Sequence, residues 1–98
     1  MVSLKQEVVA GGTASLRLDL KELTTGYGVV PDTTPTVDVY DPIGLAVVTG
    51  EDSVPLGGGE YLYNFETSTG GRRGNYKAVF SYMMNAVPFK DSCVVAVI

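Results

Sequence analysis

The feature that most constrains the fold of this chain is an alternation of apolar and polar residues with a period of two. Every second residue is apolar in the runs that show the pattern most clearly, and polar residues lie between. These runs are residues 13–21, 36–40, 60–67 and 75–82. Such alternation is typical of a strand that buries one face. Weaker runs at 4–9 and 45–48, and a long final run at 87–98, bring the expected number of strands to seven.

Short turn signals separate these runs. Asp41-Pro42-Ile43-Gly44 places proline at the first central position of a tight turn, and pairs or triplets of glycine divide other runs. No stretch has convincing helical periodicity, although residues 21–25 allow a brief helical turn. Because the chain has 98 residues and no internal repeat or linker, we expect a single domain over residues 1–98. Its fold class is all-β, an antiparallel sandwich of about seven strands with no disulfide.

The composition excludes several kinds of chemistry. The chain has no histidine and one cysteine, so it has no imidazole base or ligand and no disulfide or thiolate metal cluster. A net charge of −4 argues against nucleic-acid binding, which needs a basic surface. We therefore expect a non-enzymatic protein with no catalytic residues, no cofactor and no metal. Calcium binding is less favoured than solvated or turn-capping roles for the carboxylates considered, because no dense acidic loop is present. These carboxylates are Asp38, Asp41, Glu51 and Asp52.

The N-terminal residues lack the basic and apolar regions of a signal peptide. The longest apolar run, residues 93–98, is much shorter than the roughly 20 residues that a membrane helix needs. We therefore expect synthesis in the cytoplasm and no membrane insertion. A leader removed from a longer precursor is the alternative.

The segment Gly74-Asn75-Tyr76-Lys77-Ala78 resembles the tyrosine corner of immunoglobulin-like domains. The resemblance implies that the Tyr76 hydroxyl binds the backbone of the preceding connection. It also implies that Ala78 stands where antibody domains carry a cysteine, and that Val37 or Val39 replaces their buried tryptophan. These departures exclude an antibody-type domain and leave the wider class of disulfide-free immunoglobulin-like and fibronectin-like sandwiches.

A second resemblance covers residues 37–44, 59–63 and 74–78. Together these segments look like the small sandwich modules of tailed-phage virion proteins, bacterial surface proteins and macroglobulin-like domains. The resemblance implies a virion protein of the capsid surface, neck or tail that is assembled in the host cytoplasm. Its partners would be further copies of itself or other virion subunits. The alternative is an adhesive or carbohydrate-binding module, with Tyr27 and Tyr40 as stacking residues.

In an immunoglobulin-like sandwich, three connections gather at one end. Here they would be residues 24–35, 56–59 and 83–86. Because loops are usually polar, apolar side chains in these segments indicate a protein contact surface. The residues concerned are Tyr27, Val29, Val30, Met83 and Met84. The alternative is that some of these side chains fold back over the end of the core.

Two further sets of residues are candidates for the same kind of contact. Arg72 and Arg73, in a glycine-rich turn, fit a protein anchor better than a phosphate clamp, and a salt bridge to an acidic neighbour is the alternative. The segment of residues 93–98 is apolar throughout; as a free edge it would invite pairing with another chain, and its continuous apolarity indicates cover on both faces by a neighbouring subunit. Its candidate contact residues are Val94, Ala96 and Ile98. Cys93 fits a small buried apolar residue.

Overall fold

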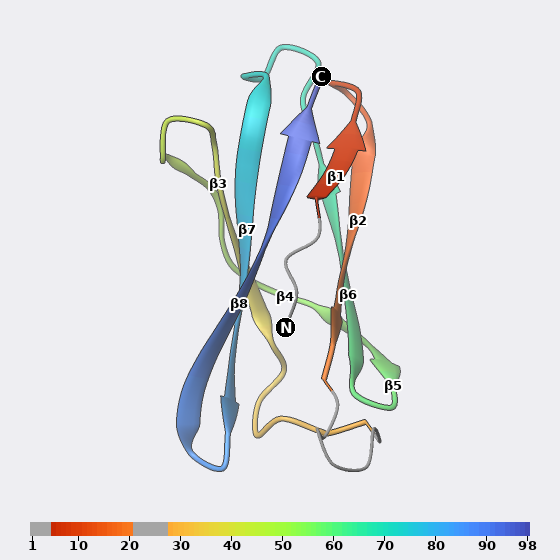
Figure 1. The fold of residues 1–98 in the computed structure, drawn as a ribbon, viewed down its shortest axis with the longest axis vertical. Helices are drawn as coiled ribbons and strands as arrows, with labels where there is room; N and C mark the ends of the chain where they lie inside the picture. The colour runs from red at the N-terminus through yellow and green to blue at the C-terminus, as the bar shows by residue number, and fades with distance from the viewer. Residues whose placement is uncertain (1–4, 21–27) are drawn as a thin grey trace.

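The computed structural model describes residues 5–20 and 28–98, which form two β-sheets packed face to face (Figure 1). One sheet has the strand order β1-β8-β7-β3-β4 and the other the order β2-β6-β5. The strands are β1 (Lys5–Val8), β2 (Thr13–Asp19), β3 (Thr36–Tyr40), β4 (Ala46–Asp52), β5 (Val54–Gly57), β6 (Glu60–Glu66), β7 (Gly74–Met84) and β8 (Val87–Val97). Strand β1 runs parallel to β8, and the other described neighbours are antiparallel. The expected all-β sandwich is confirmed, with eight strands.

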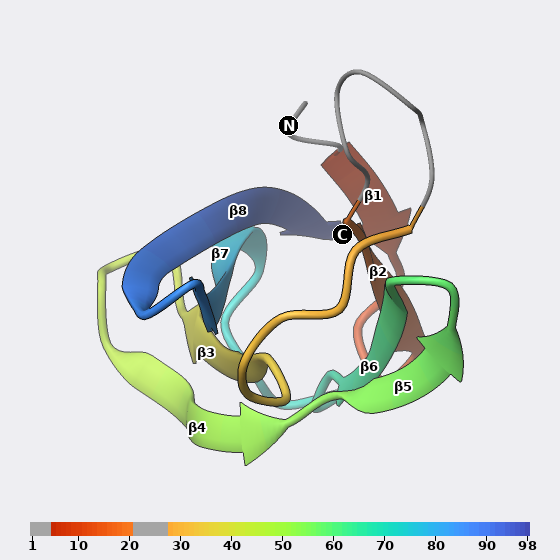
Figure 2. The same cartoon turned by 90° about the horizontal axis from the view of Figure 1, so that it is seen from below.

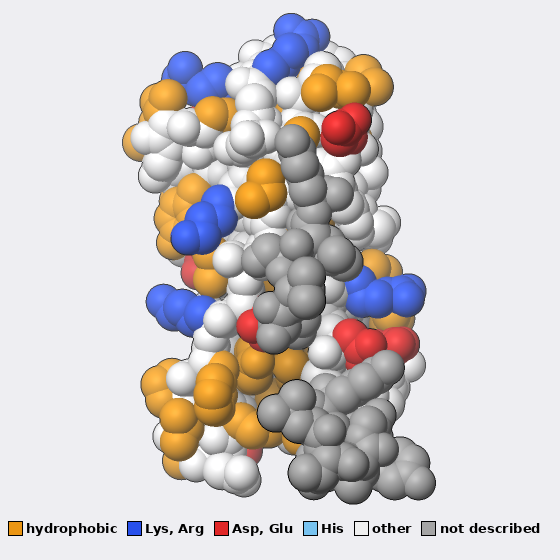
Figure 3. Space-filling model, in the orientation of Figure 1, with side chains coloured by type: hydrophobic (Ala, Val, Ile, Leu, Met, Phe, Trp, Pro, Cys, Tyr) orange, Lys and Arg blue, Asp and Glu red, His pale blue; other side chains and the backbone are white. Residues whose placement is uncertain are grey.

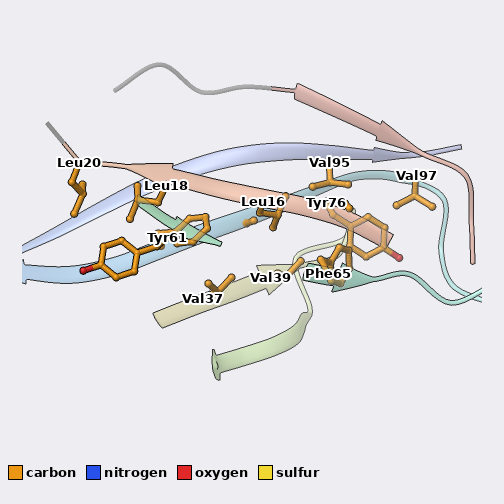
Figure 4. Close-up of a cluster of buried hydrophobic side chains, with 13 residues drawn as sticks. Leu16, Leu18, Leu20, Val37, Val39, Tyr61, Phe65, Tyr76, Val95 and Val97 are labelled. Atoms are coloured by element: carbon orange, nitrogen blue, oxygen red, sulfur yellow. The ribbon is translucent and has the colours of Figure 1, made fainter. Parts of the chain in front are cut away.

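The core lies between the sheets and follows the period-two pattern. In β2, Ala14, Leu16 and Leu18 are buried while the residues between them are exposed or half-buried. Side chains from β3, β6, β7 and β8 meet them (Figure 4). The largest members are Leu16, Leu18, Leu20, Val37, Val39, Tyr61, Phe65, Tyr76, Phe80, Val95 and Val97. Removing this apolar surface from water is the main force that holds the sheets together.

No disulfide links the sheets, because the one cysteine, Cys93, is free. Its side chain is half-buried beside the core, and burial raises the pKa of its thiol. A thiol with a raised pKa forms little of the reactive thiolate, as expected of a cysteine that serves as an apolar residue. Val37 and Val39, one of which was expected in place of the antibody tryptophan, are both fully buried.

The predicted tyrosine corner has the expected geometry. The Tyr76 hydroxyl donates a hydrogen bond of 2.6 Å to the carbonyl oxygen of Arg72. The Tyr76 ring is buried and packs against Phe65, with ring centroids 5.6 Å apart. One residue therefore fixes the β6–β7 connection to the core.

The sequence pattern did not indicate β5 or the second half of β4. The chain passes from one sheet to the other at Ser53, which is buried and bonded through its N–H and its hydroxyl to the carbonyl oxygen of Pro35. A bulge bends β4 just before this point, where Asp38 accepts a 2.6 Å hydrogen bond from the N–H of Gly50. Both strands lie at sheet edges and are largely exposed. A strand that buries neither face does not require apolar and polar residues to alternate, so its sequence lacks this pattern.

The expectation that residues 93–98 form a free edge covered by a neighbouring subunit is wrong. Residues 94–97 of β8 pair with β1 on one side and with β7 on the other. Val95, Ala96 and Val97 are buried within this single chain, so no neighbouring subunit is needed to explain their apolarity. A strand inside a sheet with both faces covered reads as a continuous apolar run.

Among residues 5–20 and 28–98, no helix is long and apolar enough to span a membrane.

Candidate protein-interaction surface

The connections β2–β3, β5–β6 and β7–β8 lie together at one end of the molecule, the lower end in Figure 1 and the near end in Figure 2. Backbone hydrogen bonds join them: Leu20 N–H to Gly59 O at 2.9 Å, and Asp32 N–H to Met83 O at 2.7 Å. The predicted clustering of three connections is therefore confirmed for the described residues. We call this region the loop end; it comprises residues 28–35, 56–59 and 83–89.

Two glycines allow these connections to approach each other closely. A Cβ atom at Gly28 would collide with the backbone of Gly58. Gly59 has a φ of +82°, and a Cβ atom there would meet the backbone of Leu20 and Val29. Glycine tolerates both the close backbone approach at these two positions and the positive φ at Gly59, whereas any other residue would be strained there. The loop end is thus a set of connections in direct backbone contact.

The β7–β8 turn is held by a side chain from a distant part of the chain. Its two central residues, Asn85 and Ala86, have φ values of 51° and 62°. The Asp32 carboxylate accepts hydrogen bonds from both of their N–H groups, at 3.2 and 2.7 Å. A two-residue hairpin turn with both φ values positive usually has Asn-Gly at its centre. The alanine here is strained, and Asp32 offsets part of that strain.

Ala86→Gly should therefore raise the free energy of unfolding. Relief of the left-handed alanine contributes about 1–2 kcal/mol, while the greater freedom of glycine in the unfolded chain removes about 0.4–1 kcal/mol. The expected net gain is about 0.5–1 kcal/mol, measured by urea denaturation. The matched control is Ala46→Gly in exposed β4, which should be destabilising. A loss of stability in both variants would contradict the strain at Ala86.

The loop end exposes apolar side chains. Val30 is 75 % exposed, Val87 50 %, Phe89 46 % and Met83 37 %. Figure 3 shows apolar side chains gathered at the lower left, where the β7–β8 hairpin ends. Loops and hairpin ends are ordinarily polar, so this concentration is characteristic of a contact surface.

The predicted loop residues divide into two groups. Val30 and Met83 are exposed, as a contact role requires, whereas Val29 is half-buried and Met84 packs against the core. The alternative reading, in which side chains fold back over the core, thus holds for Met84. Tyr27 lies outside the described residues.

The other predicted contact residues do not join this surface. Arg72 and Arg73 are exposed near the opposite end, which also carries the exposed Ile98. The Arg72 guanidinium forms a salt bridge with Asp41, with Nε 3.6 Å from Oδ2. In β8, Val94 is half-buried and Ala96 is buried. The set predicted from the sequence is therefore split between the two ends of the molecule and a sheet interior.

Sequence reasoning missed a hollow that adjoins Met83. It lies at the lower end of the five-stranded sheet and has a volume of about 510 Å³. Met83, Pro88 and Phe89 give it an apolar side, and Asp52 and Lys90 add one charge of each sign. The exposed apolar residues directly after the hairpin turn were the signal that could have found it.

An aromatic pair supports the same hairpin. The rings of Tyr82 and Phe89 are stacked, with centroids 5.9 Å apart and an angle of 19° between their planes. The Tyr82 hydroxyl donates to Asp91 Oδ2 at 2.7 Å. Burial, together with the hydrogen bond and charge of Asp91, raises the pKa of Tyr82 to about 12. The phenol thus stays neutral at ordinary pH and serves as a fixed hydrogen-bond donor.

In the part of the chain that the structure describes, no three Asp, Glu, Cys or His side chains are placed to hold a metal ion. Two of the carboxylates considered above accept backbone hydrogen bonds, Asp38 in the β4 bulge and Asp41 in the β3–β4 turn. These are the structural roles that the sequence favoured for them.

No protein-family model matches the sequence, and no curated protein matches it. Solved structures of immunoglobulin domains do match. A mutant complex of titin M10 with an obscurin-like 1 Ig domain contains a chain with 20 % identity and a TM-score of 0.51, matched over 96 % of this chain and 85 % of that one. Titin M4 has 15 % identity and a TM-score of 0.52, with 100 % and 92 % covered.

The Ig1 domain of mouse SynCAM 2 gives similar values, with 15 % identity, a TM-score of 0.51, and 96 % and 91 % of the two chains covered. At these identities the likeness concerns the fold alone. The chain has an immunoglobulin-like β-sandwich fold.

Proposed function

We propose that this chain is a non-enzymatic structural protein that assembles through protein–protein contacts, as a component of a tailed-phage virion at the head, neck or tail. The observation that carries the proposal is the exposed apolar surface of the loop end, with Val30, Leu56, Met83, Val87 and Phe89 as its members.

The apolar side chains of the loop end are exposed, and the connections that carry them are held in place by hydrogen bonds. Exposed apolar side chains gain free energy when a partner removes them from water. Here the connections that carry them are bonded to each other, and Asp32 holds the hairpin turn. A preorganised surface loses little conformational entropy on binding. The mechanism is therefore burial of a fixed apolar surface, multiplied by many copies in an assembly.

The comparisons support a protein partner in a general way, since one of the similar structures is a complex of titin M10 with an obscurin-like 1 Ig domain. The virion setting rests on the sequence resemblance of residues 37–44, 59–63 and 74–78 to phage sandwich modules. The partners would be further copies or other virion subunits. This mode of action needs no cofactor, nucleic acid or membrane insertion.

The variant that tests the surface is Met83→Ser. Met84 is unsuitable because it packs against the core. Loss of an apolar side chain at a contact centre costs about 1–2 kcal/mol, so the fraction incorporated into particles should fall at least about fivefold. Val54→Ser, which changes an exposed side chain of edge strand β5, is the control and should incorporate normally. Undiminished incorporation of Met83→Ser would reject the loop end as the contact.

A further inference from the structure

The second half of β6 has an open edge in the smaller sheet. On one side, β2 pairs with the whole strand, from Glu60 to Glu66. On the other side, β5 begins at Val54 and pairs only with residues 60–62 (Figure 1). Among residues 5–20 and 28–98, no strand pairs with the outer edge of residues 63–66. Such an edge presents backbone N–H and C=O groups that another strand can bind.

The ladder between β6 and β2 identifies which backbone groups lie on the open edge. Directly after β6, the N–H of Thr67 binds the carbonyl oxygen of Gly12 at 2.9 Å. Thr67 therefore faces β2, as does every second residue before it. Since these groups alternate between the two edges of an antiparallel strand, those of Asn64 and Glu66 point to the open edge. Each of the two residues offers one donor and one acceptor there.

A hollow of about 380 Å³ adjoins this edge, between the two sheets. Val47 and Val48 of β4 line it together with the rings of Phe65 and Tyr76. The two rings pack against each other and are largely buried, and Val47 is half exposed. Side chains of a strand point alternately to its two faces, so those on the inner face of an added strand would enter the hollow. We call the open edge and this hollow the edge site.

Hydrogen bonds hold the edge site in place at both ends of the open edge. At the end of β6, the Thr67 hydroxyl donates to the carbonyl oxygen of Gly12 at 2.6 Å and accepts from the N–H of Gly11 at 3.0 Å. Nearer β5, the Tyr63 hydroxyl donates to Glu51 at 3.1 Å and joins β6 to β4. A fixed edge loses little conformational entropy when a partner binds.

The side chains along the edge specify those of a matching strand. Asn64 and Glu66 are exposed, and Phe65 between them is buried. Besides Glu66, the charged residues of the hollow are Asp41 and Arg72, which pair with each other. Residues directly opposite in a ladder share a face. An antiparallel partner would therefore present, in chain order, a basic residue to Glu66, an apolar residue to Phe65 and a polar residue to Asn64.

This chain does not offer such a segment for a second copy of itself. In the whole sequence, a basic residue followed by an apolar and then a polar residue occurs at Arg17-Leu18-Asp19 alone. Leu18 is 2 % exposed, in the core, and β2 already pairs with β6 over these residues. The partner strand must therefore come from a different polypeptide.

We infer that the edge site binds an extended segment of another protein, which adds to the smaller sheet as an antiparallel strand in line with β5. Its backbone binds the N–H and C=O groups of Asn64 and Glu66, its apolar side chains enter the hollow, and its basic side chain faces Glu66. In this mode of recognition, the backbone hydrogen bonds supply affinity, and the positions of the alternate side chains supply specificity. The inference goes beyond the proposed function and is independent of the loop end, which lies at the other end of β6 (Figure 1).

The test uses the capped peptide acetyl-Gly-Lys-Val-Thr-Val-Gly-amide as the probe. Its lysine would face Glu66, its first valine Phe65 and its threonine Asn64. Two-dimensional NMR of the ¹⁵N-labelled protein follows each backbone amide during the titration. The amide protons of Asn64 and Glu66 should move to lower field as they form hydrogen bonds, with half-saturation at about 1 mM peptide.

Methylation of single peptide nitrogens tests the register of this pairing. In the expected complex, the N–H groups of the peptide's lysine and threonine point to β6, whereas those of its valines point to solvent. A peptide with N-methylthreonine should therefore cause no shift at Asn64 or Glu66. The matched peptide with N-methylation at the first valine should bind as the parent peptide does.

A charge exchange tests the role of Glu66. The variant Glu66→Lys should bind the lysine peptide about three- to fivefold more weakly, because like charges then lie opposite each other. It should bind a peptide with glutamate in place of lysine more tightly than the wild type does. The control Glu60→Lys changes the half of β6 that β5 already covers, and it should leave binding of the lysine peptide unchanged.

Three results would overturn the inference. These are no shift at Asn64 and Glu66, equal binding of the two methylated peptides, or shifts centred on the loop end. Shifts of Asn64 and Glu66 that grow with the concentration of the protein alone would assign the edge to a second copy and reject a different protein as the occupant. None of these results bears on the contact proposed for the loop end, which Met83→Ser tests separately.

Discussion

Leu16→Ala is expected to lower the free energy of unfolding by about 3–5 kcal/mol. Leu16 is 1 % exposed and lies at the centre of β2, where it faces the five-stranded sheet. Its truncation removes apolar burial and leaves a cavity that the neighbouring strands fill only in part. Since domains of this size have a total stability of about 5–15 kcal/mol, much of the fold's stability would be lost. Urea denaturation gives the value.

The control for this variant is the next residue in the chain. Arg17 lies in the same strand but points away from the core and is exposed. Arg17→Ala should change stability by no more than about 0.5 kcal/mol. Equal losses in the two variants would mean that β2 does not present its leucines to a common core.

Tyr76→Phe should cost about 1–3 kcal/mol. The ring keeps its packing against Phe65, but the carbonyl oxygen of Arg72 loses its 2.6 Å hydrogen bond. The bond is partly buried, so water replaces the lost donor poorly. The loss also loosens the β6–β7 connection, where Arg72 forms its salt bridge with Asp41. Chemical denaturation measures the change.

Tyr63→Phe is the matched control for the tyrosine corner. It removes a hydroxyl that donates an exposed hydrogen bond of 3.1 Å to Glu51, while the half-buried ring keeps its packing against the core. Water can replace this partner, so the cost should stay below about 0.5 kcal/mol. If the two tyrosine variants were equally stable, the hydrogen bond of Tyr76 would contribute nothing beyond that of an exposed one.

The period-two pattern predicted the strands that bury one face. Strand β3 begins and ends where the pattern does, and the buried residues of β2 and β7 are those that the alternation indicated. Edge strand β5 was missed because Val54 and Leu56 are both exposed. The end of the final strand was predicted to be a free edge because the strand that pairs with it there, β1, lies far away in the sequence.

The candidate site was predictable only in part. The apolar character of Val30 and Met83 is visible in the sequence, and the order of the strands brings their connections together. No local signal pairs Asp32 with a turn 53 and 54 residues further along the chain. Arg72 was predicted as a further contact residue, but its connection lies at the other end of the sandwich. Sequence patterns identify individual strands. The end of the sandwich at which a connection lies can be assigned only when the order of the strands in the sheets is known.

The most direct test of the account is sedimentation of the protein from its native source, with the mass of the fraction in which it travels. The account predicts that the chain moves with a large particle at a fixed stoichiometry. If it sediments alone at its monomer mass of 10.4 kDa, the proposal of a structural assembly protein is contradicted.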